Sequence, residues 1–292
     1  MYRRTVFIIL SLLFVSMIGC QAAEPEVVEV EVPVEVTRIV EVMIEAEPID
    51  DPANVNPSLR TDVLSYDSEN GRSYTAYVTL PLSYEVTEQS YPVLYVTDGD
   101  WYTLPTAMAA AQLAFGGEMP EVITVGIGYG GSAMDTMEQR ERDLTPAGAP
   151  YFLQFMEEEL IPDIEENYRA DSAVRTLMGH SLGGDFSLYA LFNAPETFGQ
   201  IVASSPSCNK GCMALEEKYA EANESLPVRL FMSVGEHEGD LITNVENLDQ
   251  TLMASNYDDM TCELAVLNGE THLSARPRAF TTGMKQVFAS EG

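Results

Sequence analysis

The chain has 292 residues and a formal net charge of −31 at neutral pH, because 46 acidic residues outnumber 15 basic ones. This balance argues against nucleic acid as a partner, since contacts with phosphates need a basic face. Once the N-terminal segments are set aside, the length suits one large α/β domain with a substantial core.

Residues 1–20 have the pattern of a bacterial lipoprotein-type signal peptide. Arg3 and Arg4 supply positive charges, and 6–18 is a mostly apolar run of 13 residues, shorter than the ~20 that cross a bilayer. The run ends in the sequence Met-Ile-Gly-Cys at residues 17–20, and Cys20 would become the lipidated N-terminus. We therefore predict an exported protein, anchored to a bacterial cell membrane and facing outside the cytoplasm. An ordinary signal peptide or a twin-arginine signal is the alternative, and both also lead to export.

Residues 21–57 are predicted to be an acidic linker rich in Val, Glu and Pro. Valine and glutamate alternate from Val28 to Val36, and a period of two is typical of an extended strand. Pro33 interrupts the alternation and like charges would crowd one face, so a solvated spacer fits the segment better. Residues 58–292 are predicted to form the folded domain.

Within this domain, short apolar runs alternate with segments of helical periodicity. The predicted strands are 73–80, 92–97, 122–128, 174–178, 201–204, 228–234 and 262–267. The predicted helices are 149–168, 241–255 and 277–289, with a further helix over 186–192. Such alternation predicts an α/β fold with a mainly parallel sheet covered by helices on both faces. In such sheets, ligands bind at the carboxyl ends of the strands.

Residues 179–183 match the pattern G-x-S-x-G, with Ser181 at its centre. The strand 174–178 precedes the pattern, and the helical segment 186–192 follows it. A strand, a sharp glycine-flanked turn and a helix form a nucleophile elbow, which exposes a serine hydroxyl at the start of the helix. The alternative is a tight glycine turn whose serine only caps the helix.

A serine hydroxyl needs a base to become a nucleophile, and the base needs an acid that orients it. In folds with a nucleophile elbow, the acid follows the serine along the chain and the histidine comes last. Of the three histidines, His180 adjoins the serine on a turn that points its ring elsewhere, and His237 lies among acids in a loop. His272 follows the last predicted strand, where a loop can return it to the elbow, and is the predicted base.

The loop after the strand 228–234 offers three carboxylates for the acid, Glu236, Glu238 and Asp240. One of them has to accept a hydrogen bond from the far nitrogen of the histidine and fix its tautomer. Asp240 is suited to capping the helix that begins at Leu241. Spacing slightly favours Glu238 over Glu236.

The tetrahedral intermediate also needs two N–H donors for its oxyanion. The backbone amide of Leu182, directly after the serine, is the first predicted donor. The second is expected in the loop after the strand 92–97, where Asp100 is the predicted donor and Gly99 the alternative. A plain Asp-Gly turn is the other explanation for this loop.

Three cysteines lie inside the predicted domain. Cys208 and Cys212 are four residues apart in a loop-like stretch, and an exported protein can hold a disulfide there. Cys262 is the third. The chain contains no CxxC pair, so a zinc ribbon has little support, and we predict no metal or organic cofactor.

In this order, the motifs resemble the esterase D-like esterases of the α/β-hydrolase superfamily, a group that includes carboxylesterases, feruloyl esterases, siderophore esterases and antigen 85 mycolyltransferases. The resemblance covers about residues 59–290. The motifs that carry it are 72–74 with 80–81, 91–95 before 98–100, 142–146, 179–184, 205–207, 234–238 and His272. It implies an α/β-hydrolase fold, a triad of Ser181, Glu238 and His272, and an oxyanion amide at Asp100.

Two positions depart from the family pattern. Asp185 stands where an apolar residue is usual, as either a polar group of the pocket or a charge favoured by the helix dipole, and the second fits better. The Ser-Pro-Ser loop at 205–207 leads to Cys208 instead of an aromatic residue.

We therefore predict a serine hydrolase that cleaves small carboxylic esters through an acyl-enzyme. A siderophore esterase acting on anionic trilactone ferric siderophores, or an acyltransferase, is the alternative on the same fold. The few basic residues of the domain, such as Arg140 and Arg276, count against the anionic siderophore. A catalytically inactive surface-binding lipoprotein is the alternative from another class, and the complete triad argues against it.

Overall fold

The computed structural model describes residues 59–289 apart from residue 209. The predicted signal peptide, Cys20 and the linker lie outside these described residues, so export and lipidation stay predictions. The strands are β1 (Thr61–Asp67), β2 (Ser73–Thr79), β3 (Tyr91–Thr97), β4 (Ile123–Gly128), β5 (Ala170–His180), β6 (Gln200–Ser204), β7 (Arg229–Gly235) and β8 (Thr261–Leu267). The helices are α1 (Gly99–Phe115), α2 (Ala133–Leu144), α3 (Ala149–Phe155), a π-helical turn η2 (Met156–Leu160), α4 (Ile161–Asn167), α5 (Leu182–Asn193), α6 (Lys210–Ala220), α7 (Asp240–Ser255) and α8 (Ala275–Val287).

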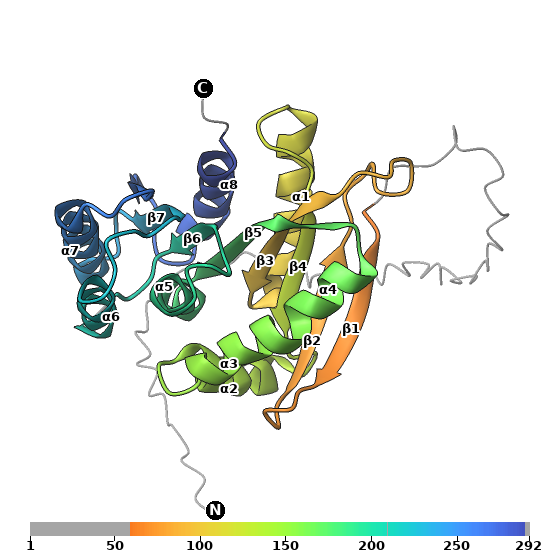
Figure 1. The fold of residues 1–292 in the computed structure, drawn as a ribbon, viewed down its shortest axis with the longest axis horizontal. Coiled ribbons are helices and arrows are strands. Elements are labelled where there is room, and N and C mark those ends of the chain that lie inside the picture. The colour runs from red at the N-terminus through yellow and green to blue at the C-terminus, as the bar shows by residue number, and fades with distance from the viewer. Residues whose placement is uncertain (1–58, 209, 290–292) are drawn as a thin grey trace, which may run out of the picture. The chain divides into compact units, whose positions relative to one another are not determined.

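The strands form one sheet in the order β1-β2-β4-β3-β5-β6-β7-β8 (Figure 1). β1 and β2 pair antiparallel, as do β2 and β4, whereas β4, β3, β5, β6, β7 and β8 run parallel. Parallel strands bring their carboxyl ends to one edge of the sheet. The register sets His180 of β5 opposite Ser204 of β6, which is opposite Ser233 of β7.

Helices cover both faces of the sheet (Figure 1). α1 and α8 contact each other and pack on one face, and α4, α5 and α7 pack on the other. β3 shows the consequence for the sequence, because Val93 and Tyr95 enter one core while Leu94 and Val96 enter the other. Strands buried on both faces are apolar at consecutive positions. The predicted α/β class, with a mainly parallel sheet and helices on both faces, is confirmed.

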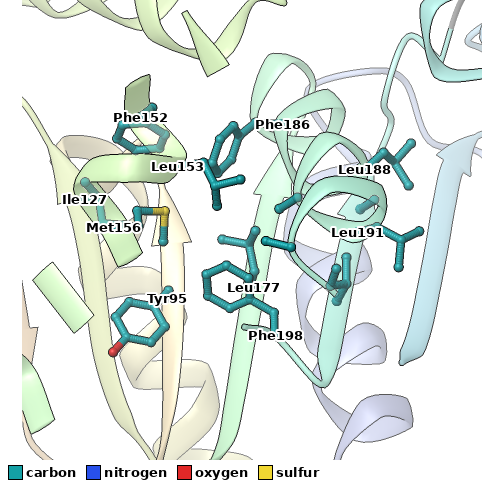
Figure 2. Close-up of a cluster of buried hydrophobic side chains, with 14 of the residues drawn as sticks. Tyr95, Ile127, Phe152, Leu153, Met156, Leu177, Phe186, Leu188, Leu191 and Phe198 are labelled. Atoms are coloured by element: carbon teal, nitrogen blue, oxygen red, sulfur yellow. The ribbon is translucent and has the colours of Figure 1, made fainter. Parts of the chain in front are cut away.

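Figure 2 shows the larger core, into which α5 packs. Phe186 of α5 meets Phe152 of α3 edge to face, with ring centroids 4.8 Å apart. Tyr95 of β3 meets Phe198 in the same way at 6.0 Å. Each such buried ring contributes about 1.5–3 kcal/mol to stability. The first pair holds α5 against α3, and the second holds the segment after α5 against β3.

The predicted helix 149–168 is interrupted by η2, which separates α3 from α4. Pro162 lies in the first turn of α4, and proline lacks an N–H and its ring presses against the carbonyl four residues earlier. A widened turn before Pro162 relieves this conflict. Within the described residues, no helix is both long and apolar enough to span a bilayer.

Candidate active site

Ser181 is the one residue between β5 and α5. Its backbone has φ 59° and ψ −121°, a sparsely populated region that costs about 1–3 kcal/mol. The glycines on either side are required by close contacts. A Cβ atom at Gly179 would lie 2.0 Å from the carbonyl oxygen of Gly183, and one at Gly183 would lie 2.1 Å from Thr97 Oγ1. The local geometry is that of a strained nucleophile elbow.

His272 reaches the edge of the sheet from the loop between β8 and α8. Its Nδ1 and Glu238 Oε2 are 2.6 Å apart. The side chain of Glu238 is 2% exposed and that of His272 is 38% exposed, so the carboxylate is buried behind a ring that solvent can reach.

The structure separates the three candidate acids of this loop. Glu238 contacts His272, whereas the Glu236 carboxylate accepts a hydrogen bond from the Gly269 amide at 2.6 Å. The interpretation of Asp240 as a helix cap is wrong, because Asp240 is the first residue of α7 and the capping position is Gly239. Gly239 has φ 56°, which glycine adopts without strain and aspartate does not.

The second oxygen of Glu238 has partners of its own. Oε1 accepts hydrogen bonds from Ser205 Oγ at 2.7 Å and from the Gly235 amide at 2.6 Å. Two donors on one oxygen and His272 on the other fix the plane of the carboxylate. Sequence reasoning missed this role of Ser205, because the two residues are 33 positions apart.

His180 is buried next to the elbow, and its Nδ1 lies 3.0 Å from Ser204 Oγ. The His180 and His272 rings are 4.7 Å apart between centroids. Burial, followed by the charges of His272, Arg276 and Arg140, lowers the pKa of His180 to about 3. The ring is therefore neutral at physiological pH, and it lies between Ser204 and the ring of His272. His237 is exposed, and its backbone amide bonds the Glu270 carbonyl.

Leu182 and Asp100 lie in the first turns of α5 and α1, where amides have no acceptor within their own helix. The two helix starts are close together, because a Cβ atom at Gly183 would be 3.3 Å from Asp98 Oδ2. The side chain of Asp100 has partners away from its own backbone amide. Its carboxylate accepts hydrogen bonds from Tyr77 Oη and from the amides of residues 129 and 130. The arrangement presents the positive ends of two helix dipoles at one place.

A buried ion pair supports this region and was not predicted. Arg140 Nε of α2 donates to Asp98 Oδ1 at 2.6 Å, and Arg140 Nη2 donates to the carbonyl of His180 at 3.3 Å. Burial raises the pKa of Asp98, and the Arg140 guanidinium counteracts that shift. Arg140 thereby links α2, the start of α1 and the end of β5.

Hydrogen bonds and a disulfide hold the loop after β6 in place. Asp185 of α5 accepts hydrogen bonds from Ser207 Oγ at 2.6 Å and from the Cys208 amide at 3.0 Å. Cys208 and Cys212 are joined as a disulfide, with Cα atoms 5.0 Å apart. Asp185 thus lies in the first turn of α5, as the dipole interpretation requires, and also anchors the loop. Among the described residues, no group of three or more His, Cys, Asp or Glu is placed to hold a metal ion.

Comparison with known proteins gives a consistent result. A family model described as "Putative esterase" matches residues 68–272. The ferri-bacillibactin esterase BesA of Bacillus subtilis is 27% identical over 270 residues, which cover 81% of this chain and 91% of that protein. The siderophore triacetylfusarinine C esterase of Aspergillus fumigatus is 33% identical over 175 residues, covering 52% of this chain and 58% of that protein.

Solved structures agree. The BES protein of Bacillus cereus has a TM-score of 0.71 and 28% identity, covering 79% of this chain and 95% of that one. An IroE-like serine hydrolase of Shewanella oneidensis has the same TM-score of 0.71 at 22% identity, covering 78% of this chain and 80% of that one, which supports the fold. The expected α/β-hydrolase fold is confirmed. Since the family match spans more than half of the chain, the protein belongs to this esterase family of the α/β hydrolases and is a serine hydrolase that acts on carboxylic esters.

Proposed function

We propose that this enzyme hydrolyses siderophore esters, with Ser181, His272 and Glu238 as its catalytic triad. The observation that carries the triad is the 2.6 Å contact between His272 and Glu238, with the His272 ring 4.7 Å from that of His180, the residue before Ser181. The relatives support the substrate class, because two of them are named as siderophore esterases. They favour the siderophore alternative over a general carboxylesterase.

In the proposed reaction, Ser181 Oγ attacks the ester carbonyl while His272 Nε2 accepts its proton. Glu238 holds the imidazole by Nδ1 and stabilises the imidazolium that forms. The amides of Leu182 and Asp100 bind the oxyanion, and each such donor is typically worth about 10²- to 10³-fold in rate. His272 then protonates the leaving alcohol, and water releases the acyl group by the same steps in reverse.

Hydrolysis of ferric trilactone siderophores by the purified enzyme, followed by chromatography of the linear products, tests the proposal. Ser181→Ala should lower turnover by about 10⁴-fold or more. Ser65→Ala, on the exposed side of the edge strand β1, is the matched control and should behave as the native enzyme.

Two outcomes would count against the proposal. Turnover that survives in Ser181→Ala would remove the serine from the mechanism. Rapid cleavage of 4-nitrophenyl esters without any cleavage of siderophores would leave the esterase and reject the substrate class.

A further inference from the structure

Arg276 is a cation placed between two parts of the active site. It is the second residue of α8, four positions after His272. Its guanidinium carbon lies 3.7 Å from the centroid of the Tyr102 ring. Tyr102 belongs to the first turns of α1, two positions after Asp100, and α1 and α8 pack together. Arg276 therefore joins the segment of the proposed base to that of the proposed oxyanion amide.

Among the described residues, Arg276 forms no ion pair, and its charge acts only at longer range on the buried Asp98 carboxylate. Arg140 is paired with Asp98, and Arg72 and Arg142 share Asp143. In the part of the chain that the structure describes, Arg276 has an aromatic ring as its partner and no ion pair.

Stacking on a ring occupies the face of a guanidinium and leaves its N–H edges available. Those edges match the geometry of a carboxylate and can also donate to a single anionic oxygen. The charge of Arg276 acts on the elbow as well. Burial and then His272 make the largest contributions to the lowered pKa of His180, and Arg276 makes the next. The half-buried position reduces solvent screening of such a contact.

We propose that Arg276, held against Tyr102, binds an anionic oxygen of the ester substrate next to the scissile bond. This inference rests on the proposed function and adds the residue that recognises an anionic ester. It also answers the objection that the domain is too acidic for such a substrate. With a net charge of −31 the molecule repels anions at long range, so a local unpaired cation decides where an anionic group can bind.

The test compares neutral and anionic esters that share a leaving group or an acyl group. The first pair is 4-nitrophenyl hexanoate and mono(4-nitrophenyl) adipate, whose charge lies on the acyl side. The second pair is phenyl acetate and 4-acetoxybenzoate, whose charge lies on the leaving group. For each pair the measured quantity is the ratio of kcat/KM for the anionic ester to that for the neutral one, after subtraction of the uncatalysed rate.

Arg276→Gln should lower this ratio by about 10- to 100-fold in at least one pair, as expected for loss of a charged hydrogen bond. Arg276→Lys should recover part of the ratio, because lysine keeps the charge and loses the planar fork. Arg278→Gln is the matched control on the same helix, exposed and bonded only weakly to the Asn268 carbonyl at 3.4 Å. It should leave both ratios as in the native enzyme.

Unchanged ratios in Arg276→Gln for both pairs would overturn the inference, as would an equal loss on neutral and anionic esters. Failure of the proposed function would look different, because the native enzyme would then cleave simple esters but no siderophore.

Discussion

At the residue scale, the environment of Glu238 determines what the proposed triad can do. A buried carboxylate is stable only when its charge is met by donors. Here Ser205 Oγ and the Gly235 amide contact one oxygen and His272 the other. The carboxylate therefore cannot rotate without losing hydrogen bonds, and it holds the imidazole in one orientation and one tautomer.

Glu238→Gln should therefore reduce kcat far more than Glu236→Gln. An amide at 238 would turn its NH₂ group toward either Ser205 and Gly235 or the histidine, and each choice sets two donors against each other. The expected loss is about 10²- to 10⁴-fold. Within the described residues, the one hydrogen bond of the Glu236 carboxylate comes from the exposed Gly269 amide, and the Glu236 variant should stay within about threefold of native. Steady-state kinetics on one ester decides between them, and the opposite ranking would move the acid to Glu236.

The environment of His180 leads to a second prediction at the residue scale, which concerns how the free energy of unfolding depends on pH. Its pKa is lowered from 6.5 to about 3 by burial first and by neighbouring cations second. The unfolded chain therefore binds a proton between these pH values that the folded protein excludes. The stability due to this residue is fully present above pH 6.5 and falls as the pH drops toward 3, by about 1.4 kcal/mol per pH unit.

In His180→Asn this proton is absent, so the free energy of unfolding should fall less steeply over that window. Urea unfolding at a series of pH values measures the two slopes. Parallel slopes would show that His180 does not exclude the proton.

At the element scale, the loop between β6 and α6 links the disulfide to the proposed acid. Ser205 and Cys208 have positive φ values of 44° and 37°, conformations that side chains adopt only when neighbours enforce them. Asp185 and the disulfide supply that constraint at the Cys208 end. Ser205 lies in the same loop and donates a hydrogen bond to Glu238, so the constraint on the loop also limits where the Glu238 carboxylate can lie.

Replacing both Cys208 and Cys212 by serine should lower the free energy of unfolding by about 2 kcal/mol, the value expected for a short closed loop. The variant should also lose part of kcat, because the loop that carries Ser205 is freed. A reductant should affect the native enzyme in the same way and leave the variant unchanged. Cys262→Ser, at the free cysteine on β8, is the control. Equal stability of native and doubly substituted protein would contradict the prediction.

The elements differ in how well sequence predicts them. The parallel strands were found because burial on both faces makes them continuous apolar runs. α1 was missed because its start, Asp98-Gly99, is typical of a turn and Pro105 lies inside it. β1 was missed because it is an edge strand whose residues alternate between exposed and half-buried.

The residues of the candidate site also differ in how well the sequence predicts them. Ser181, Glu238 and His272 occur in short motifs whose order along the chain is fixed by the fold. The contact of Arg140 with Asp98 and that of Ser207 with Asp185 join residues 42 and 22 positions apart. Such pairs depend on which helix packs beside which strand, and no local pattern specifies that.

At the scale of the whole molecule, the sheet has its first strand within the described residues. β1 begins at Thr61, and the Arg60 carbonyl already accepts a hydrogen bond from the Leu80 amide. A chain cut to residues 58–292 keeps these contacts. It should therefore have the unfolding midpoint and the kcat of the full chain, and a large loss of either would show that residues 1–57 belong to the domain.

The full chain and the shortened chain should differ in where they are found. We propose that the full chain is exported and lipidated at Cys20, because residues 1–20 have the pattern of a lipoprotein-type signal peptide. Two attached acyl chains would then hold the protein on a membrane, since each buried CH₂ group contributes about 0.8 kcal/mol. Expressed in a bacterium with labelled palmitate, the full chain should carry the label and enter the detergent phase. Residues 58–292 should stay in the aqueous phase, and Cys20→Ser should lose the label. An unlabelled full chain found outside the cytoplasm would instead support an ordinary signal peptide, with the acidic linker of residues 21–57 as a free N-terminal extension of a released enzyme.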